Sequence, residues 1–199
     1  MIKRTFDIIC AALGLVLLSP VMALIAFWIK CDTPGEVFFR QERVGRFGRN
    51  FRIHKFRTMV SGAAVGGPAL TAAHDLRITP SGRFLRQHKL DELPQLIDVL
   101  MGDMSLVGPR PEVPEFVAMY PSKVRDEVLS VRPGITDETS VRLRNESALL
   151  ANVADARKFY IETLMPLKLA SYLDYVRTRS FGRDFLILAR TAWAIIKNS

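Results

Sequence analysis

An apolar segment near the N-terminus constrains the fold of this chain more than any other feature. Residues 6–29 read FDIICAALGLVLLSPVMALIAFWI. As a helix they would extend roughly 36 Å, and the hydrocarbon core of a bilayer is about 30 Å thick. The segment is therefore predicted to lie in a membrane. A cleaved signal peptide is disfavoured, because Phe27, Trp28 and Ile29 continue the apolar run where a small-residue cleavage site should lie.

Two features of this segment argue against a simple membrane span. Ser19 and Pro20 lie near its middle, where proline removes a backbone hydrogen bond and bends the helix. Both flanks are also positive, so the positive-inside bias selects no orientation. A helix that enters, bends at Ser19-Pro20 and leaves by the same face satisfies both flanks. A bitopic anchor that tolerates the proline stays open as the alternative. The flanking cations are Lys3, Arg4, Lys30, Arg40, Arg43, Arg46, Arg49 and Arg52.

Asp7 lies close to the start of the apolar segment. An acid at that depth needs a partner, and Lys3 and Arg4 are close enough along one helix face. We therefore expect one of these cations to pair with Asp7. An interfacial acid whose side chain reaches water is the alternative.

The charge and the apolar content narrow the class of protein. The 199 residues are 49% hydrophobic and carry a net charge of +8. This combination suits an anionic membrane surface, where each Lys or Arg contributes about 1 kcal/mol. The charge also permits nucleic-acid binding, but the apolar segment and the lack of a helix-turn-helix or aromatic-ladder pattern speak against it. Cys10 and Cys31 show neither metal nor disulfide spacing, and the three histidines match no metal motif.

Residues 90–112, LDELPQLIDVLMGDMSLVGPRPE, begin with an acid pair at the start of a helical pattern. Pro94 fits the first turn of a helix, which places Asp91 and Glu92 at or near its N-terminus. A longer helix from about Ser81, kinked at Pro94, is the competing interpretation. The apolar positions that recur at three- and four-residue spacing are Leu93, Leu96, Ile97 and Leu100.

The same stretch ends in an arginine held between two prolines, Pro109-Arg110-Pro111. An acid pair close to such an arginine suits chemistry on a phosphate. A carboxylate can attack phosphorus or hold Mg²⁺, and a guanidinium offers a planar fork of donors to phosphoryl oxygens. The alternative is purely structural, with Asp91 as a helix cap and Glu92 as a first-turn acid.

The rest of the chain predicts short strands, turns and helices. Residues 37–41 and 51–56 read as two strands joined by a turn at 45–50, which indicates a β-hairpin. Glycine and proline indicate a loop at 61–69 and a turn at 132–136. Helices are expected at 147–164 and 181–197. The last is amphipathic, with Trp193 and basic residues, so it suits either a membrane interface or packing on the core.

Several blocks, taken together and in order, resemble the bacterial sugar transferases, the monotopic phosphoglycosyl transferases. Each block is weak alone, whereas the ordered combination is very specific and spans most of the chain. The blocks are Lys3-Arg4 with Asp7, Ser19-Pro20, Lys55-Phe56-Arg57-Thr58-Met59, Leu90-Asp91-Glu92-Leu93-Pro94-Gln95-Leu96, residues 102–112 (GDMSLVGPRPE) and Arg132-Pro133-Gly134-Ile135-Thr136.

The resemblance implies an α+β, mainly helical fold in two parts. Residues 1–31 would form a re-entrant membrane helix kinked at Ser19-Pro20. Residues 32–199 would form a compact catalytic domain with a short β-hairpin and amphipathic interfacial helices, including 181–197. The implied location is the cytoplasmic face of the bacterial inner membrane. The oligomeric state stays open.

The implied reaction moves a phosphosugar from a nucleotide diphosphosugar, usually a UDP-sugar, to polyprenyl phosphate and releases the nucleoside monophosphate. In the family the Asp of the acid pair is the nucleophile and lies near Mg²⁺, a role that carries to Asp91, with Glu92 assisting. Arg110 would contact phosphate. A non-enzymatic basic scaffold in the membrane is the alternative, but it gives no reason for the acid pair. The remaining residues that we assign to the substrate phosphates are Lys55, Arg57, Arg86 and Glu112.

The chain departs from the family pattern at two places. Asp98 and Met101 stand where members commonly have Asn and Lys. Residues 137–141 read DETSV, where many members continue with G-W-A-Q-V. The catalytic assignment is unaffected, but the identity of the sugar stays open.

We predict that Ser19→Ala combined with Pro20→Ala straightens the membrane helix and moves the N-terminus across the bilayer. The reason is that Ser19 can satisfy backbone groups that Pro20 releases in lipid, and alanine removes both effects. Labelling of a cysteine placed near Met1 reports the side on which the N-terminus lies, with the otherwise unchanged chain as the control. Labelling only from the cytoplasmic side in the double variant would contradict the prediction.

Overall fold

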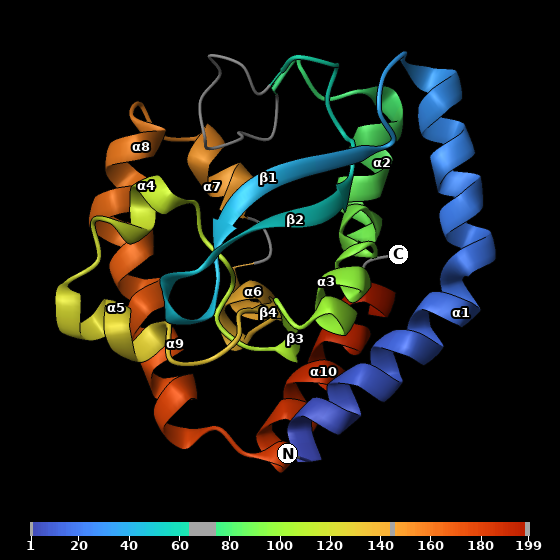
Figure 1. Cartoon of the computed structure of the whole chain (residues 1–199). Helices are drawn as coiled ribbons and strands as arrows, with labels where there is room; N and C mark the ends of the chain where they lie inside the picture. The colour runs from blue at the N-terminus through green and yellow to red at the C-terminus, as the bar shows by residue number, and fades with distance from the viewer. Residues whose placement is uncertain (1, 64–74, 144–145, 198–199) are drawn as a thin grey trace.

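A computed structural model describes residues 2–63, 75–143 and 146–197. Helices surround a central β-hairpin and a small parallel sheet (Figure 1), so the α+β, mainly helical class is confirmed. α1 (Ile2–Asp32) lies along one side of the molecule, and α9 (Met165–Thr178) lies on the opposite side. Most of the loop predicted at 61–69 falls outside the described residues.

α1 is long and apolar enough to cross a membrane, and little of it is buried in the protein. One narrow stripe packs inward, whereas side chains such as Leu17, 75% exposed, face outward. Pro20 lies inside the helix, and Ser19 Oγ donates to the carbonyl of Val16 at 2.8 Å, as expected. The helix changes direction along its length in Figure 1. Its re-entrant course in a membrane stays a prediction.

The expected pairing of Asp7 with Lys3 or Arg4 is wrong. Asp7 is buried, and its carboxylate accepts hydrogen bonds from Ser105 Oγ at 2.8 Å and from the backbone N–H of Leu106 at 3.2 Å. The cations instead bind groups farther along the chain. Asp7 therefore docks the start of α1 onto a strand, and neutral donors rather than a cation satisfy the acid.

The predicted hairpin is confirmed. β1 (Phe38–Val44) pairs antiparallel with β2 (Asn50–Phe56), and a helical turn at Arg46–Gly48 joins them. β1 continues three residues beyond the predicted end. Ile53 and Phe56 of β2 are buried in the core, so the hairpin forms one wall of it.

The acid pair lies in a short 3-10 turn, Leu90–Glu92, between two helices. α2 (Pro80–Gln87) ends before it, and α3 (Gln95–Met101) follows it. Lys89 has φ of 58°, a left-handed conformation that a continuous helix cannot contain. The single kinked helix from Ser81 is therefore wrong, whereas the position of the acids just before α3 is confirmed.

A parallel pair of strands replaces the turn that we predicted at 132–136. β3 (Ser105–Val107) pairs with β4 (Gly134–Thr136). Two short helices, α4 (Pro114–Val117) and α5 (Ser122–Val128), lie between them in the chain. The turn residues Pro133 and Gly134 misled the prediction, because the glycine serves here to let two backbones approach closely.

The single helix predicted at 147–164 is also wrong. The chain forms α6 (Glu138–Arg142), α7 (Glu146–Ala151), α8 (Ala156–Phe159) and a π-helical turn at Tyr160–Leu164. The carboxylate of Asp155 accepts a hydrogen bond from the Lys158 N–H at 2.9 Å, which starts α8 and interrupts the helical pattern. α10 (Phe181–Lys197) has the predicted bounds.

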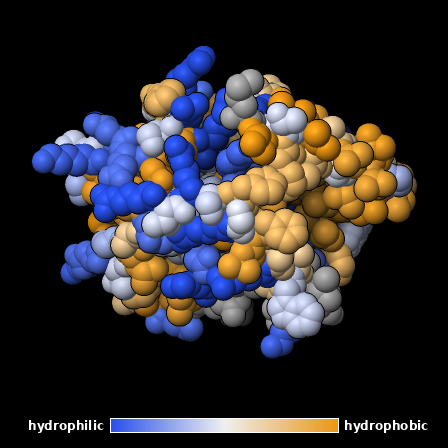
Figure 2. Space-filling view, turned by 90° about the horizontal axis from the view of Figure 1, so that it is seen from below, coloured by the Kyte–Doolittle hydropathy of each residue, from blue (hydrophilic) through white to orange (hydrophobic). Residues whose placement is uncertain are grey.

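One face of α10 packs on the core, and other side chains of the helix stay exposed. Asp184 and Ile187 are buried against the core, whereas Phe185 and Trp193 are 63% and 68% exposed. Figure 2 shows hydrophobic residues gathered on the side of the molecule where α1 lies. A face of exposed apolar side chains of this size is typical of a membrane-contacting surface. Placement of α10 at the interface stays a prediction.

We expect Gly134→Ala to lower the thermal unfolding midpoint by about 4 °C or more, because overpacking a tight site costs about 1–3 kcal/mol. A Cβ at Gly134 would lie 2.1 Å from the backbone nitrogen of Gly108. Gly182→Ala is the matched control, since a Cβ there meets nothing within 4 Å. Thermal unfolding in detergent compares the two. Equal midpoints would show that β3 and β4 do not approach as described.

Candidate active site

Glu92 binds two cations that come from different parts of the fold. Its Oε1 accepts a hydrogen bond from Lys55 Nζ of β2 at 2.8 Å. The guanidinium of Arg110 donates to both carboxylate oxygens, with Nη1 lying 3.1 Å from Oε2. A bidentate pair of this kind fixes the plane of the guanidinium. Glu92 thus joins the hairpin, the acid turn and the Pro-Arg-Pro loop.

The charges of Glu92, Arg110 and Lys55 shift one another's pKa values. Burial alone would raise the pKa of Glu92, but the charges of Arg110 and Lys55 and their hydrogen bonds lower this pKa well below its ordinary value. The charge of Glu92 in turn raises the pKa of Arg110. Burial lowers the pKa of Lys55, which Glu92 partly offsets. Glu92 and Arg110 therefore each favour the charged form of the other, and their hydrogen bonds hold the geometry of the pair.

Asp91 has the opposite environment. Its side chain is buried, and Oδ1 has no hydrogen-bond partner in the described part of the chain. Burial raises the pKa of Asp91, and the charge of Glu92 adds to this rise. The cations Lys55, Arg86 and Lys89 oppose it. A buried carboxylate without a partner is costly, so its retention indicates a ligand or a reaction at this atom.

Mg²⁺ fits this site through Asp91. Protein sites for Mg²⁺ combine one or two carboxylates with substrate phosphates and waters. The cations Lys55 and Arg110 already occupy Glu92, whereas Asp91 keeps an oxygen without a partner. Among the described residues, no group of three or more His, Cys, Asp or Glu side chains could hold a metal. Asp91 and the phosphates of a substrate would therefore hold the ion.

Of the two other predicted arginines, one lies near the acid pair. Arg86 is partly buried, its Nε donates to Thr58 Oγ1 at 2.8 Å, and its charge acts on Asp91. Arg57 does not join this cluster. Its guanidinium donates to the carbonyls of Thr33 and Pro34, each at 2.6 Å, just beyond α1. These contacts occupy its terminal nitrogens and leave Nε without a partner among the described residues, so Arg57 anchors the end of α1 and is not carried into the proposed site.

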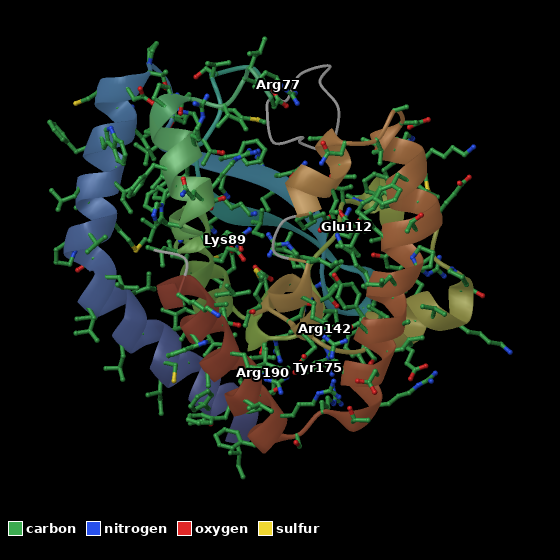
Figure 3. The ribbon with its side chains drawn as sticks, turned by 180° about the vertical axis from the view of Figure 1, so that it is seen from behind. Arg77, Lys89, Glu112, Arg142, Tyr175 and Arg190 are labelled. Carbon is green, nitrogen blue, oxygen red and sulfur yellow. The ribbon has the colours of Figure 1, made fainter. Side chains whose placement is uncertain are left out.

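Glu112 also lies outside the acid-pair cluster. Its Oε1 accepts from Arg43 Nη1 at 3.1 Å, and Oε2 accepts from the hydroxyl of Tyr160. Arg43 also donates to the Pro111 carbonyl at 3.1 Å. Figure 3 labels Glu112 across the middle of the molecule from Lys89. We assigned Glu112 to substrate phosphate, but these contacts indicate that it holds the loop that carries Arg110.

Arg43, Tyr160 and the pair His54–Asp98 hold this region together, although the sequence pattern assigned none of them to the site. His54 Nδ1 lies 2.5 Å from Asp98 Oδ1, and the His54 N–H donates to Oδ2 at 2.9 Å. The alternation of β1 could have found Arg43, because it lies on the partly buried side of the strand. No local signal points to Tyr160, whose hydrogen-bond partner is 48 positions away.

The sequence pattern of the bacterial sugar transferases matches residues 1–198. This chain belongs to the bacterial sugar transferase family. It is 36% identical over 197 residues to a UDP-N-acetylgalactosamine-undecaprenyl-phosphate N-acetylgalactosaminephosphotransferase of Aeromonas hydrophila, covering 98% of this chain and 44% of the relative. It is 38% identical over 208 residues to a UDP-glucose:undecaprenyl-phosphate glucose-1-phosphate transferase of Caulobacter vibrioides, covering 98% and 69%.

A third relative is an undecaprenyl-phosphate galactose phosphotransferase of Salmonella typhimurium, 35% identical over 212 residues. That match covers 98% of this chain and 40% of the relative. The chain thus spans less than half of the Aeromonas and Salmonella proteins. The names of the three relatives give different sugars, and all three include undecaprenyl phosphate.

One of the two places where the chain departs from the family pattern, residues 137–141, lies beside the acid-pair site. The charge of Asp137, the first residue of the DETSV segment, acts on Arg110. The Asp137 carboxylate accepts from the N–H groups of Thr139 and Ser140 and so starts α6. The segment that differs from many members therefore adjoins the arginine that we assign to phosphate.

We expect that removing the charge of Asp91 and removing the charge of Glu92 change the stability of the fold in opposite directions. Folding raises the pKa of Asp91 above its ordinary value of 3.8. The neutral carboxyl therefore stabilises the folded state below pH 3.8, and this stabilisation is lost as the pH rises through the pKa of Asp91 in the folded protein. Asp91→Asn should therefore unfold at a higher temperature than the unmodified chain at pH 8, with a difference that shrinks toward pH 4.

Glu92→Gln is the matched comparison for Asp91→Asn. The pKa of Glu92 is lowered on folding, so its stabilisation is present above 4.5 and is lost as pH falls through the folded value. We expect the variant to unfold about 5 °C or more lower at pH 8, because two partly buried cations lose their partner. Thermal unfolding from pH 4 to 8 measures both variants. A lower midpoint for Asp91→Asn at pH 8 would refute the assignment.

Proposed function

We propose that this chain transfers a phosphosugar from a UDP-sugar to polyprenyl phosphate and releases UMP, the first membrane step in assembling a glycoconjugate. The observation that carries the proposal is the buried Asp91 carboxylate next to cations held by Glu92, since its Oδ1 has no hydrogen-bond partner among the described residues. The names of the relatives support the donor and the acceptor. Phosphoryl transfer depends on positioning and on charge neutralisation, which this cluster can provide.

The reaction proceeds in two displacements. An Asp91 oxygen attacks the phosphorus that bears the sugar, the bond from that phosphorus to UMP breaks, and UMP leaves with the electron pair. The enzyme then carries a phosphosugar on Asp91. An oxygen of polyprenyl phosphate attacks the same phosphorus, the bond to Asp91 breaks, and the carboxylate is restored. Covalent catalysis of this type divides one difficult transfer into two easier steps.

Cationic side chains reduce the repulsion between Asp91 and an anionic donor. Glu92 holds Arg110 and Lys55 in place, and the charge of Arg86 acts on Asp91. Both terminal nitrogens of Arg110 donate to Glu92, so its remaining N–H groups would meet the phosphoryl oxygens. Bound Mg²⁺, held by Asp91 and the diphosphate, would add further neutralisation of charge.

The membrane helix supplies access to the acceptor. The exposed apolar side of α1 suits acyl and prenyl chains, and α1 packs on α3, the helix that follows the acid pair. We infer a monotopic enzyme on the cytoplasmic face of the bacterial inner membrane, with α1 re-entrant. Polyprenyl phosphate would then reach the acid pair from the bilayer surface.

We predict that incubating the enzyme with donor alone yields a covalent adduct with the mass of one phosphosugar, and that Asp91→Asn yields none and has no activity. Intact-mass analysis and UMP release measure the two effects. Asp126→Asn, a change at an exposed acid, is the matched control and should keep both.

Two outcomes would count against this mechanism. Full activity in Asp91→Asn would sink the assignment of the nucleophile. Turnover without any adduct, under conditions that trap the enzyme with donor, would favour a direct transfer in which the acids only hold metal. UMP release from UDP-sugars in liposomes separates either mechanism from a non-enzymatic scaffold.

A further inference from the structure

A second charged site lies at the N-terminal end of α1 and shares no residue with the acid-pair site. It is a cavity of about 200 Å³, the space of roughly seven waters. Figure 3 labels Tyr175, which lines it, far below Lys89 and Glu112 in that view. The cavity forms where the start of α1, the turn of the hairpin and the end of α9 meet. The cations that line it are Lys3, Arg4, Arg46, Arg132 and Arg179.

The positive charge of this cavity is largely unpaired. Among the described residues, Lys3 alone of these five cations forms an ion pair, with Asp184 of α10 at 2.6 Å. Asp7 is the one carboxylate among the lining residues, and neutral donors already occupy its oxygens. Many other arginines of the chain pair with carboxylates, so this concentration of unpaired guanidinium groups favours an anionic ligand.

The arginines are held so that donors remain for such a ligand. Arg132 Nε donates to the Gly102 carbonyl at 2.7 Å, and Arg46 Nε donates to the Ser130 carbonyl at 2.9 Å. Within the described residues, the terminal nitrogens of both have no hydrogen-bond partner, and Arg179 forms none at all. Guanidinium groups that are fixed at Nε and free at Nη present forks suited to phosphate oxygens.

The neighbourhood of the cavity is apolar. Phe6 of α1 contacts Phe181 of α10, with ring centroids 5.2 Å apart. Ile2 is 78% exposed, and Phe181 is about half exposed. From there the exposed side of α1 continues as an apolar surface. A ligand with a phosphate at one end and hydrocarbon at the other would satisfy the cations and this surface together.

We propose that this cavity binds the phosphate of an anionic phospholipid whose acyl chains lie along α1 and α10. The bound headgroup neutralises Arg46 of the hairpin turn, Arg132 before β4 and Arg179 after α9, next to the start of α1. It therefore ties the N-terminal end of α1 to the catalytic domain at the level of the membrane surface. Because the acid-pair site is separate, this binding does not depend on the transferase reaction.

The test uses the full chain in a neutral detergent, titrated with phosphatidylglycerol, with phosphatidylcholine of the same acyl chains, or with inorganic phosphate. Thermal unfolding and native mass spectrometry measure binding. The variant is Arg46→Gln with Arg179→Gln, because neither change removes a buried ion pair. Arg125→Gln with Arg157→Gln removes the same charge from exposed positions outside the cavity and is the matched control.

We expect one phosphatidylglycerol per chain and a saturable rise in the unfolding temperature. The cavity variant should bind at least about tenfold more weakly, whereas the control variant should bind normally. Phosphatidylcholine and inorganic phosphate should give little stabilisation. Equal binding by both variants, or equal binding of phosphatidylcholine, would overturn the proposal. Inorganic phosphate that binds as tightly as phosphatidylglycerol would assign the cavity to free phosphate and overturn the lipid assignment.

Discussion

The contact between Glu92 and its two cations is the interaction on which the candidate site depends. It joins β2, the acid turn and the loop that carries Arg110, three segments that are far apart in the sequence. Because Glu92 takes both cations as direct partners, its neighbour Asp91 stays buried with an oxygen unpaired. Two adjacent carboxylates therefore acquire opposite properties, and the charged partners of one make the other available for chemistry.

Polar contacts at both ends of α1 place the membrane segment against this site. Asp7 docks its start on β3, Arg4 donates to the carbonyl of Val99 at the end of α3, and Arg57 binds carbonyls beyond its last turn. Between these points most side chains face outward, and Ala11 packs into the core. Polar contacts thus hold both ends of the helix, α1 also packs on α3, and most side chains of its apolar middle stay exposed on the protein surface.

Local patterns predicted the hairpin and α10 well. The helix expected at 147–164 failed because of a local cap at Asp155, whereas other failures came from long-range partners. Alternation and turn residues were sufficient for the hairpin, and helical periodicity was sufficient for α10. Asp7 was assigned to neighbours within one turn, but its donor Ser105 is 98 positions away. Arg57 and Glu112 lie in matching blocks of the family, yet their contacts are set by carbonyls and side chains that no spacing rule identifies.

The contacts that start α6 are separate from the contacts that hold Glu92 and its two cations. The Asp137 carboxylate accepts hydrogen bonds from the N–H groups of Thr139 and Ser140. These bonds fix the beginning of α6 just after β4. Side chains in this segment can therefore differ without disturbing Glu92, whose partners come from elsewhere. Since the charge of Asp137 acts on Arg110, such differences act beside the arginine that we propose as a phosphate ligand. Relatives that share an acceptor and differ in their sugar are what this arrangement leads us to expect.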